Sequence, residues 1–143
     1  MIAPKLERNH KAIGELSQAY IIARLIEIGY NVLVPYGDSI RYDLIIEDDE
    51  GQFWRVQCKT GWMDQARSVI KFATASSYNY TTKEKVWKHY RGQCEYFAVY
   101  CPETRSVYLL PVDEVGLTQA ILRITPTTNN QEKGVRWAKD YEI

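Results

Sequence analysis

The sequence lacks the features of several large classes of protein. A membrane-spanning helix needs about 18 consecutive apolar residues, and the sequence has no apolar run close to that length. Its N-terminus also lacks the basic segment followed by an apolar segment that is typical of a signal peptide. The formal net charge is zero, so overall charge does not indicate a nucleic-acid partner. We therefore expect one cytoplasmic domain over residues 1–143, long enough for an ordinary hydrophobic core.

Cysteine is also scarce, and its spacing excludes two kinds of stabilised fold. The three cysteines are Cys58, Cys94 and Cys101, an odd number with no C-x-x-C pair. This pattern predicts reduced thiols, and it argues against a disulfide framework or a zinc cluster.

Charge is unevenly distributed along the chain. Residues 38–52 carry six acidic residues and one basic residue, whereas residues 53–91 carry eight basic and two acidic residues. The basic stretch could face a polyanion, or it could be a solvated surface balanced elsewhere in space, and the count leaves both open. If this stretch faces a polyanion such as DNA, the residues that would contact it are Arg67, Lys71, Lys83, Lys85, Lys88 and Arg91.

Residues 11–29 form the clearest predicted helix. Small and apolar residues recur at intervals of three and four, and Gly29 follows as a stop signal. Glu15 lies at the margin of this face, where a carboxylate is costly unless it is paired or binds a metal. Alternatively, Glu15 reaches solvent or pairs with a basic residue. The stripe that we expect to be buried comprises Ala12, Leu16, Ala19, Ala23 and Ile26.

The rest of the chain predicts mainly strands, with the helix packed across a central mixed sheet. Residues 75–82 read as a polar loop, and residues 113–122 as a second helix. Residues 83–91 are either a short basic helix or an extended loop. We expect an N-terminal arm at 1–10 and a polar C-terminal extension at 125–143, anchored by Trp137 and Tyr141. The predicted strands are 31–35, 41–47, 53–60, 68–74, 95–101 and 106–112.

The predicted hairpin formed by 41–47 and 53–60 brings three polar side chains together. Asp43 lies roughly opposite Gln57, and Lys59 shares the face of Gln57 because it lies two residues further along the strand. The residues expected on the other face are Trp54, Val56 and Cys58.

These side chains suit metal-assisted phosphodiester hydrolysis. The Asp43 carboxylate and the Gln57 amide oxygen are hard donors, as Mg²⁺ or Mn²⁺ prefers, and Glu15 could add another donor directly or through water. Lys59 could orient or help deprotonate a metal-bound water, or stabilise charge on the phosphate in the transition state.

A purely structural interpretation stays open at this point. Asp43 could pair with Arg41 or Arg55, and Gln57 and Lys59 could be the exposed face of an edge hairpin. Most random Asp…Gln-x-Lys patterns are of that kind. The combination of adjacent strands in register, a helix glutamate and a following basic segment favours a site.

The motifs Gly14-Glu15, Arg41-Tyr42-Asp43 and the run VQCKTG at 56–61 resemble the PD-(D/E)xK nuclease superfamily. The Gln-x-Lys form resembles the branch that includes group I intron-encoded homing endonucleases, and archaeal Holliday-junction resolvases are more distant relatives. The later run YFAVYCPETRSVYLLPV is similar to the second half of that branch. The resemblance covers about residues 12–112.

The resemblance implies a restriction-endonuclease-like α/β core, an α-β-β-β-α-β arrangement with a central mixed sheet flanked by helices. It implies magnesium-dependent cleavage of double-stranded DNA, with Mn²⁺ as a substitute, and catalytic roles for Glu15, Asp43, Gln57 and Lys59. Gln57 stands where the superfamily usually has Asp or Glu, so the metal site has one negative charge fewer. Tyr42 stands where the superfamily often has Pro. The expected metal ligands are Asp43, Gln57, the backbone carbonyl of Cys58 and, directly or through water, Glu15.

The expected enzyme is a homing-type, sequence-specific endonuclease, and the alternative is a Holliday-junction resolvase acting on branched DNA. Either would be a homodimer or homotetramer, because one domain of this size presents one active site and two strands must be cut. An alternative of another class is a DNA-binding module whose catalytic activity has lapsed.

Overall fold

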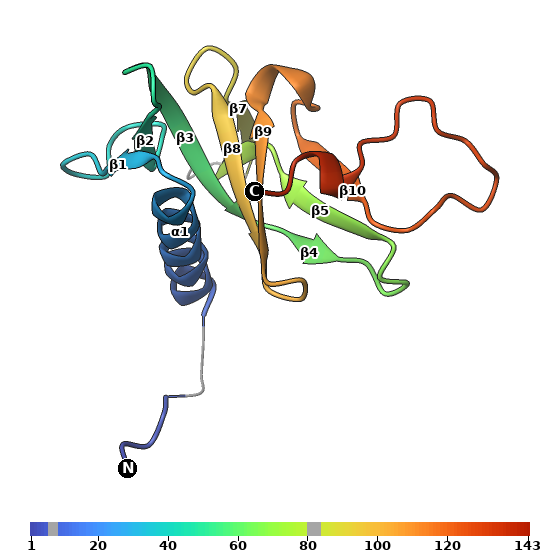
Figure 1. The fold of residues 1–143 in the computed structure, drawn as a ribbon, viewed down its shortest axis with the longest axis horizontal. Helices are drawn as coiled ribbons and strands as arrows, with labels where there is room; N and C mark the ends of the chain where they lie inside the picture. Colours follow the sequence, from blue (N-terminus) through green and yellow to red (C-terminus); the bar gives the residue numbers. More distant parts are fainter. Residues whose placement is uncertain (6–8, 80–83) are drawn as a thin grey trace.

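The computed structural model describes residues 1–5, 9–79 and 84–143 (Figure 1). In chain order, its elements are α1 (His10–Glu27), β1 (Asn31–Leu33), β2 (Leu44–Glu47), β3 (Phe53–Thr60), β4 (Trp62–Met63), β5 (Val69–Ala73), β6 (Ala75–Asn79), β7 (Lys85–His89), β8 (Tyr96–Cys101), β9 (Ser106–Pro111), η1 (Val112–Glu114), β10 (Gln119–Arg123) and η2 (Ala138–Asp140).

The central sheet is mixed, as predicted. Its five strands run in the order β1-β2-β3-β8-β9, with β3 and β8 parallel and the other neighbours antiparallel. A second sheet has the order β10-β5-β4, and β6 pairs with β7 in a two-stranded ribbon. Figure 1 shows α1 and the β4–β5 strands on opposite sides of β3 and β8.

Two hydrophobic clusters cover the two faces of the central sheet. Successive side chains of a strand point to opposite faces, and β8 follows this rule. Ala98 and Tyr100 pack in the cluster that contains α1, whereas Phe97, Val99 and Cys101 pack in the cluster that contains β5 and β10. The central sheet is therefore the middle layer of three.

The predicted buried stripe of α1 was wrong by a partial turn. The buried residues are Ser17, Ile21 and Leu25, while Ala19 and Ala23 are exposed; Ile26, also in the predicted stripe, is 57% exposed. The second half of the helix is apolar on most sides, so spacing alone did not select a face. Packing selects the face with the bulkier pair, Ile21 and Leu25, because burying larger apolar side chains gains more free energy.

The predicted helix at 113–122 was also wrong. After the short η1 turn, β10 pairs antiparallel with β5. Ala120 and Leu122 are buried, whereas Gln119 and Ile121 are exposed, which is the period-two pattern of a strand.

Residues 68–91 differ from the expectation as well. Residues 68–74 contain the predicted strand, but β5 belongs to the second sheet and not to a continuous meander. The described part of 75–89 forms the antiparallel β6–β7 ribbon, where a polar loop followed by either a short helix or an extended loop was predicted. Within the described residues α1 is the one α-helix, so the second helix of the α-β-β-β-α-β order is replaced there by strands.

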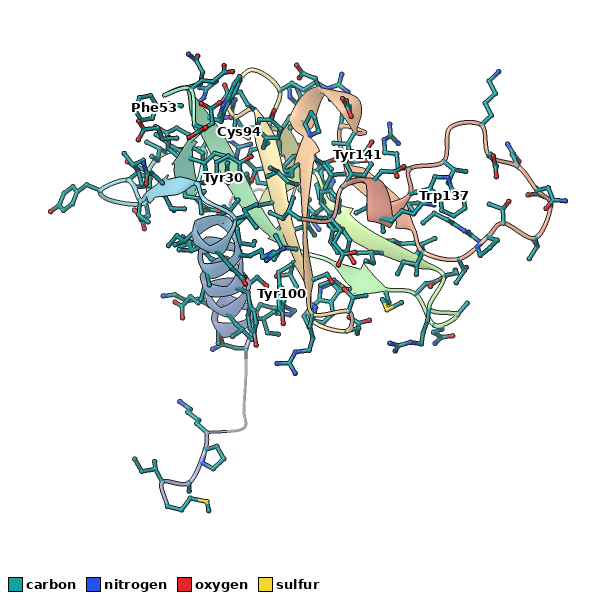
Figure 2. All side chains as sticks on the ribbon, in the orientation of Figure 1. Tyr30, Phe53, Cys94, Tyr100, Trp137 and Tyr141 are labelled. Carbon is teal, nitrogen blue, oxygen red and sulfur yellow. The ribbon has the colours of Figure 1, made fainter. Side chains whose placement is uncertain are left out.

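The start of α1 and the C-terminal segment are each held by local contacts, whereas residues 1–5 extend away from the body of the protein (Figure 1). Asn9 caps α1 by accepting a hydrogen bond from the Ala12 backbone N–H at 2.9 Å, so the helix begins within the predicted arm. Near the other end, Trp137 is half-buried and Tyr141 packs against a core cluster, as predicted (Figure 2). Within the described ranges, no helix has the length and hydrophobicity needed to cross a bilayer.

Gly61 allows β5 to approach the end of β3, and its substitution should destabilise the fold. A Cβ at Gly61 would lie 2.7 Å from Ile70 Cγ2 and 2.9 Å from Val99 Cγ1, closer than side-chain carbons pack. Gly61→Ala should therefore lower the free energy of unfolding by about 1–3 kcal/mol. Gly14→Ala is the matched control, because its Cβ would meet nothing within 4 Å and alanine should raise helix stability by up to about 1 kcal/mol. Urea unfolding of both variants tests this, and equal effects would contradict it.

Candidate active site

The register of β2 and β3 places Asp43 and Gln57 side by side, as the sequence predicts. The last residue pair of the ladder is Leu44 with Val56, so the next position on each strand is Asp43 and Gln57. The Asp43 backbone N–H donates to the Val56 carbonyl at 3.0 Å. Beyond that pair, the Asp43 side chain takes the place of a backbone acceptor: its Oδ2 accepts a hydrogen bond from the Cys58 backbone N–H at 2.9 Å.

The two faces of β3 divide as predicted. Val56 is fully buried in the cluster on the α1 side of the sheet, and Cys58 packs against the same cluster. Lys59 projects to the opposite face, where its Nζ donates to the hydroxyl of Tyr90 at 3.3 Å. Gln57 shares the face of Lys59 because the two residues are two apart on one strand.

A pocket of about 350 Å³ opens beside Asp43 and Gln57, and Tyr90, the partner of Lys59, also lines it. A larger cavity of about 710 Å³ lies beside the C-terminal segment, but it shares no lining residue with this pocket and contains neither Asp43 nor Gln57. We therefore place the candidate active site at the smaller pocket. Its lining residues are Asp38, Ser39, Ile40, Arg41, Asp43, Gln57, Ser76 and Tyr90.

Burial changes the acidity of both ionisable residues on β2 and β3. The pKa of Lys59 is lowered from 10.5 to about 8, mainly by burial; the Asp43 carboxylate acts against this shift, and the nearby Arg41 charge contributes to it. Burial also raises the pKa of Asp43, although the Cys58 N–H and the Lys59 charge act against this. At neutral pH Lys59 is therefore mostly a cation, but one that loses its proton more readily than an ordinary lysine.

The structural interpretation that Asp43 pairs with an arginine does not describe this site. Arg55 forms an ion pair with Glu95, with Nη2 and Oε1 2.5 Å apart. The Arg41 guanidinium donates to Ser76 Oγ at 2.6 Å and to Gln93 Oε1.

Arg41 and Tyr90 are the site residues that the sequence analysis missed. The central carbon of the Arg41 guanidinium lies 4.0 Å from the centroid of the Tyr90 ring, and Lys59 Nζ lies 4.7 Å from the same centroid. In the sequence Arg41 was noted as part of the Arg41-Tyr42-Asp43 motif and as a possible partner of Asp43, but not as a site residue. Tyr90 carries no such signal, since it follows the basic β7 strand far along the chain.

Glu15 is not among the residues that line the pocket. It is exposed on α1, which packs against the face of β3 opposite to Lys59. Two residues later, Ser17 is buried and its hydroxyl lies 2.6 Å from that of Thr60, next to Lys59. The helix therefore crosses β3 close to the site, and the catalytic role of Glu15 stays a prediction.

The basic residues expected to contact DNA lie on several elements. Arg67 is exposed in the turn before β5, and Lys71 is exposed on β5. Lys85 and Lys88 are exposed on β7, where Lys85 Nζ lies 4.5 Å from the centroid of the Trp87 ring. Arg91 donates to the Val115 carbonyl at 2.9 Å, and Lys83 lies outside the described residues.

The oxygen donors at the pocket fit a hard divalent cation that keeps several waters. Asp43 supplies a carboxylate and Gln57 an amide oxygen, both at the end of the β2–β3 ladder. The Cys58 carbonyl points to the same strand edge as its N–H, which bonds Asp43. Among the described residues, no three His, Cys, Asp or Glu side chains cluster around a possible metal position.

Comparison with known proteins identifies the family. The family model described as PD-(D/E)XK endonuclease matches residues 8–143. The chain belongs to the PD-(D/E)XK endonuclease family. The resemblance noted from Asp43, Gln57 and Lys59 is therefore confirmed, and the protein is a nuclease.

A solved structure supports the same assignment for this PD-(D/E)XK endonuclease. The bacterial homing endonuclease I-Ssp6803I matches with a TM-score of 0.74 and 25% sequence identity, over 94% of this chain and 89% of that one. The restriction-endonuclease-like fold is thereby confirmed, although strands occupy the place of the second helix. A comparison with curated protein sequences found no match.

The acidity of Lys59 can be measured directly. We expect its side-chain amine to titrate near pH 8 by NMR, instead of near the ordinary 10.5. Asp43→Asn should lower this pKa further, because Asp43 stabilises the lysine cation and asparagine keeps an oxygen to accept the Cys58 N–H. Titration near 10.5, or a rise in the Asp43→Asn variant, would contradict the described environment of Lys59.

Proposed function

We propose that this PD-(D/E)XK endonuclease is a magnesium-dependent enzyme that hydrolyses phosphodiester bonds in double-stranded DNA at specific sequences, as a homing-type endonuclease does. The single observation that carries the proposal is that Asp43 and Gln57 line one pocket while Lys59 reaches a third lining residue, Tyr90, through its Nζ. The homing-type assignment rests on the Gln-x-Lys motif and on the similarity to a bacterial homing endonuclease.

The proposed roles follow from the chemistry of each group. Asp43, Gln57 and the Cys58 carbonyl would hold Mg²⁺, or Mn²⁺ in its place, and the cation would supply Lewis-acid stabilisation of the phosphate. Lys59, which is mostly protonated at neutral pH, would stabilise the negative charge that develops on the phosphate oxygens. Glu15 would add a further oxygen ligand to the metal, directly or through water.

Gln57 makes the proposed metal site weaker than one with two carboxylates. Replacing a carboxylate by a neutral amide removes one negative charge from the ligands, while both groups offer an oxygen donor. We infer that metal binding is coupled to DNA binding, because the scissile phosphate would supply charge that the protein omits.

The proposed DNA surface comprises the exposed basic residues Arg67, Lys71, Lys85 and Lys88, with Lys83 and Arg91 as further members. Their support is positive charge and exposure, and Lys85 and Lys88 lie on β7, which pairs with the strand β6 that carries the pocket residue Ser76. A dimer or tetramer is proposed as well, because each chain presents one such pocket and cutting a duplex needs two.

Cleavage assays with a Lys59 variant test the proposed function. With Mg²⁺ we expect cutting of DNA that carries the target site, no cutting with chelator, and at least about a 100-fold loss in Lys59→Ala, because a buried charge-stabilising group is removed. Lys139→Ala is the matched control, since Lys139 is an exposed lysine outside the pocket and should leave cleavage unchanged.

The choice of DNA separates the remaining alternatives. A randomised plasmid library, which contains the unknown target, and a synthetic four-way junction are incubated with the same proteins. Cutting of the junction alone would show a resolvase. DNA binding without cutting of either substrate would show a module whose activity has lapsed, and cutting that survives Lys59→Ala would place the active site elsewhere.

A further inference from the structure

Tyr90 connects the catalytic lysine to the body of the protein. Its side chain is 4% exposed, and it lies between the end of β7 and the start of β8. Its hydroxyl accepts the hydrogen bond from Lys59 Nζ at 3.3 Å, and the same residue lines the pocket with Asp43 and Gln57. The hydroxyl of Tyr90 is therefore at the reacting end of Lys59.

The Tyr90 ring is fixed by its neighbours. It meets the Phe97 ring edge-on, with centroids 5.6 Å apart and an interplanar angle of 86°, in the cluster beneath β8. The Arg41 guanidinium lies over the ring at 4.0 Å. Aromatic and cation–π contacts of this kind hold a ring in one orientation.

Arg41 in turn joins Tyr90 to both strands of the β6–β7 ribbon. Its guanidinium donates to Ser76 Oγ on β6 at 2.6 Å, and to the carbonyls of Lys88 and His89 on β7 at 3.2 and 3.0 Å. A planar guanidinium can satisfy several acceptors in fixed directions, which a lysine cannot do. The base of the ribbon, Arg41 and the Tyr90 ring therefore form one connected unit beside the pocket.

We propose that Tyr90 is a positioning residue for the reaction, and that its hydroxyl, held through Arg41 by the β6–β7 ribbon, fixes the ammonium group of Lys59 at the scissile phosphate. A lysine side chain has four rotatable bonds, so an ammonium that must stabilise one phosphate oxygen benefits from a fixed partner. The proposal rests on the proposed nuclease function of Lys59 and adds the residues that set its geometry.

Tyr90→Phe tests this role, because it removes one hydroxyl and keeps the ring. We expect kcat for DNA cleavage to fall about tenfold, equivalent to about 1.4 kcal/mol in the activation barrier, with unchanged KM and melting temperature. Tyr108→Phe is the matched control. Tyr108 is a 3%-exposed tyrosine in the same cluster, and its hydroxyl lies 3.2 Å from Thr104 Oγ1 instead of Lys59.

A second readout does not depend on cleavage. The Lys59 ammonium lies over the Tyr90 ring, so NMR signals of the Lys59 ε-methylene protons should be shifted by the ring current. In Tyr90→Phe the ring remains, and a collapse of this shift would show that the lysine has lost its position.

The outcomes separate this inference from the proposed function. A tenfold loss of kcat in Tyr90→Phe, together with the collapsed shift and a Tyr108→Phe variant like the wild type, supports the positioning role. If Lys59→Ala abolishes cleavage while Tyr90→Phe keeps wild-type kcat and the shift, the positioning role is wrong and the nuclease function stands. Equal losses in Tyr90→Phe and Tyr108→Phe would show only a general effect on packing, and would also overturn it.

Discussion

The hydrogen bond from the Cys58 backbone N–H to the Asp43 carboxylate is the interaction on which the site depends. The β2–β3 ladder ends at the Leu44–Val56 pair, and this bond continues it with a side chain in place of a backbone carbonyl. A carboxylate that accepts from a backbone N–H is held in place at the strand edge and is favoured in its charged form. Because the N–H and the carbonyl of one strand residue point to the same edge, the Cys58 carbonyl also lies on the edge of β3 that faces Asp43. Strand pairing thus sets the geometry of the proposed metal ligands.

Burial gives this small group of residues its chemical character. Lys59 lies on the face of β3 that packs away from α1, where removal from water makes its cation easier to neutralise, and Asp43 is partly desolvated beside it. Their opposite charges stabilise each other, so each limits the shift of the other. Arg41 adds a second positive charge near the pocket, and a negatively charged phosphate would fit between these groups. The proposed metal ligands are therefore one carboxylate and two oxygen donors without charge, with cations nearby, and the exposed Asp38 lines the same pocket.

Local patterns of the sequence predicted the geometry of the β2–β3 hairpin better than they predicted the outer parts of the fold. The hairpin register, the opposite faces of Gln57 and Val56, and the apolar strands at 95–101 and 106–112 followed from alternation and were correct. The stripe of α1 and the strand β10 were mispredicted, because tertiary packing chose among apolar faces that spacing left equivalent. The roles of Arg41 and Tyr90 depend on contacts between segments about 50 residues apart, which no local pattern encodes.

The uncharged side chain at position 57 distinguishes the proposed metal site from a site with two carboxylates. Metal binding therefore tests the proposed site most directly. The measurement is calorimetric titration of Mn²⁺ into the wild type, Gln57→Glu and Asp43→Asn, with Gln65→Glu as a control for added charge at an exposed position. The account predicts tighter binding in Gln57→Glu, loss of binding in Asp43→Asn, and wild-type affinity in Gln65→Glu. Equal affinities in Gln57→Glu and Gln65→Glu, or wild-type binding in Asp43→Asn, would show that Asp43 and Gln57 do not hold the metal.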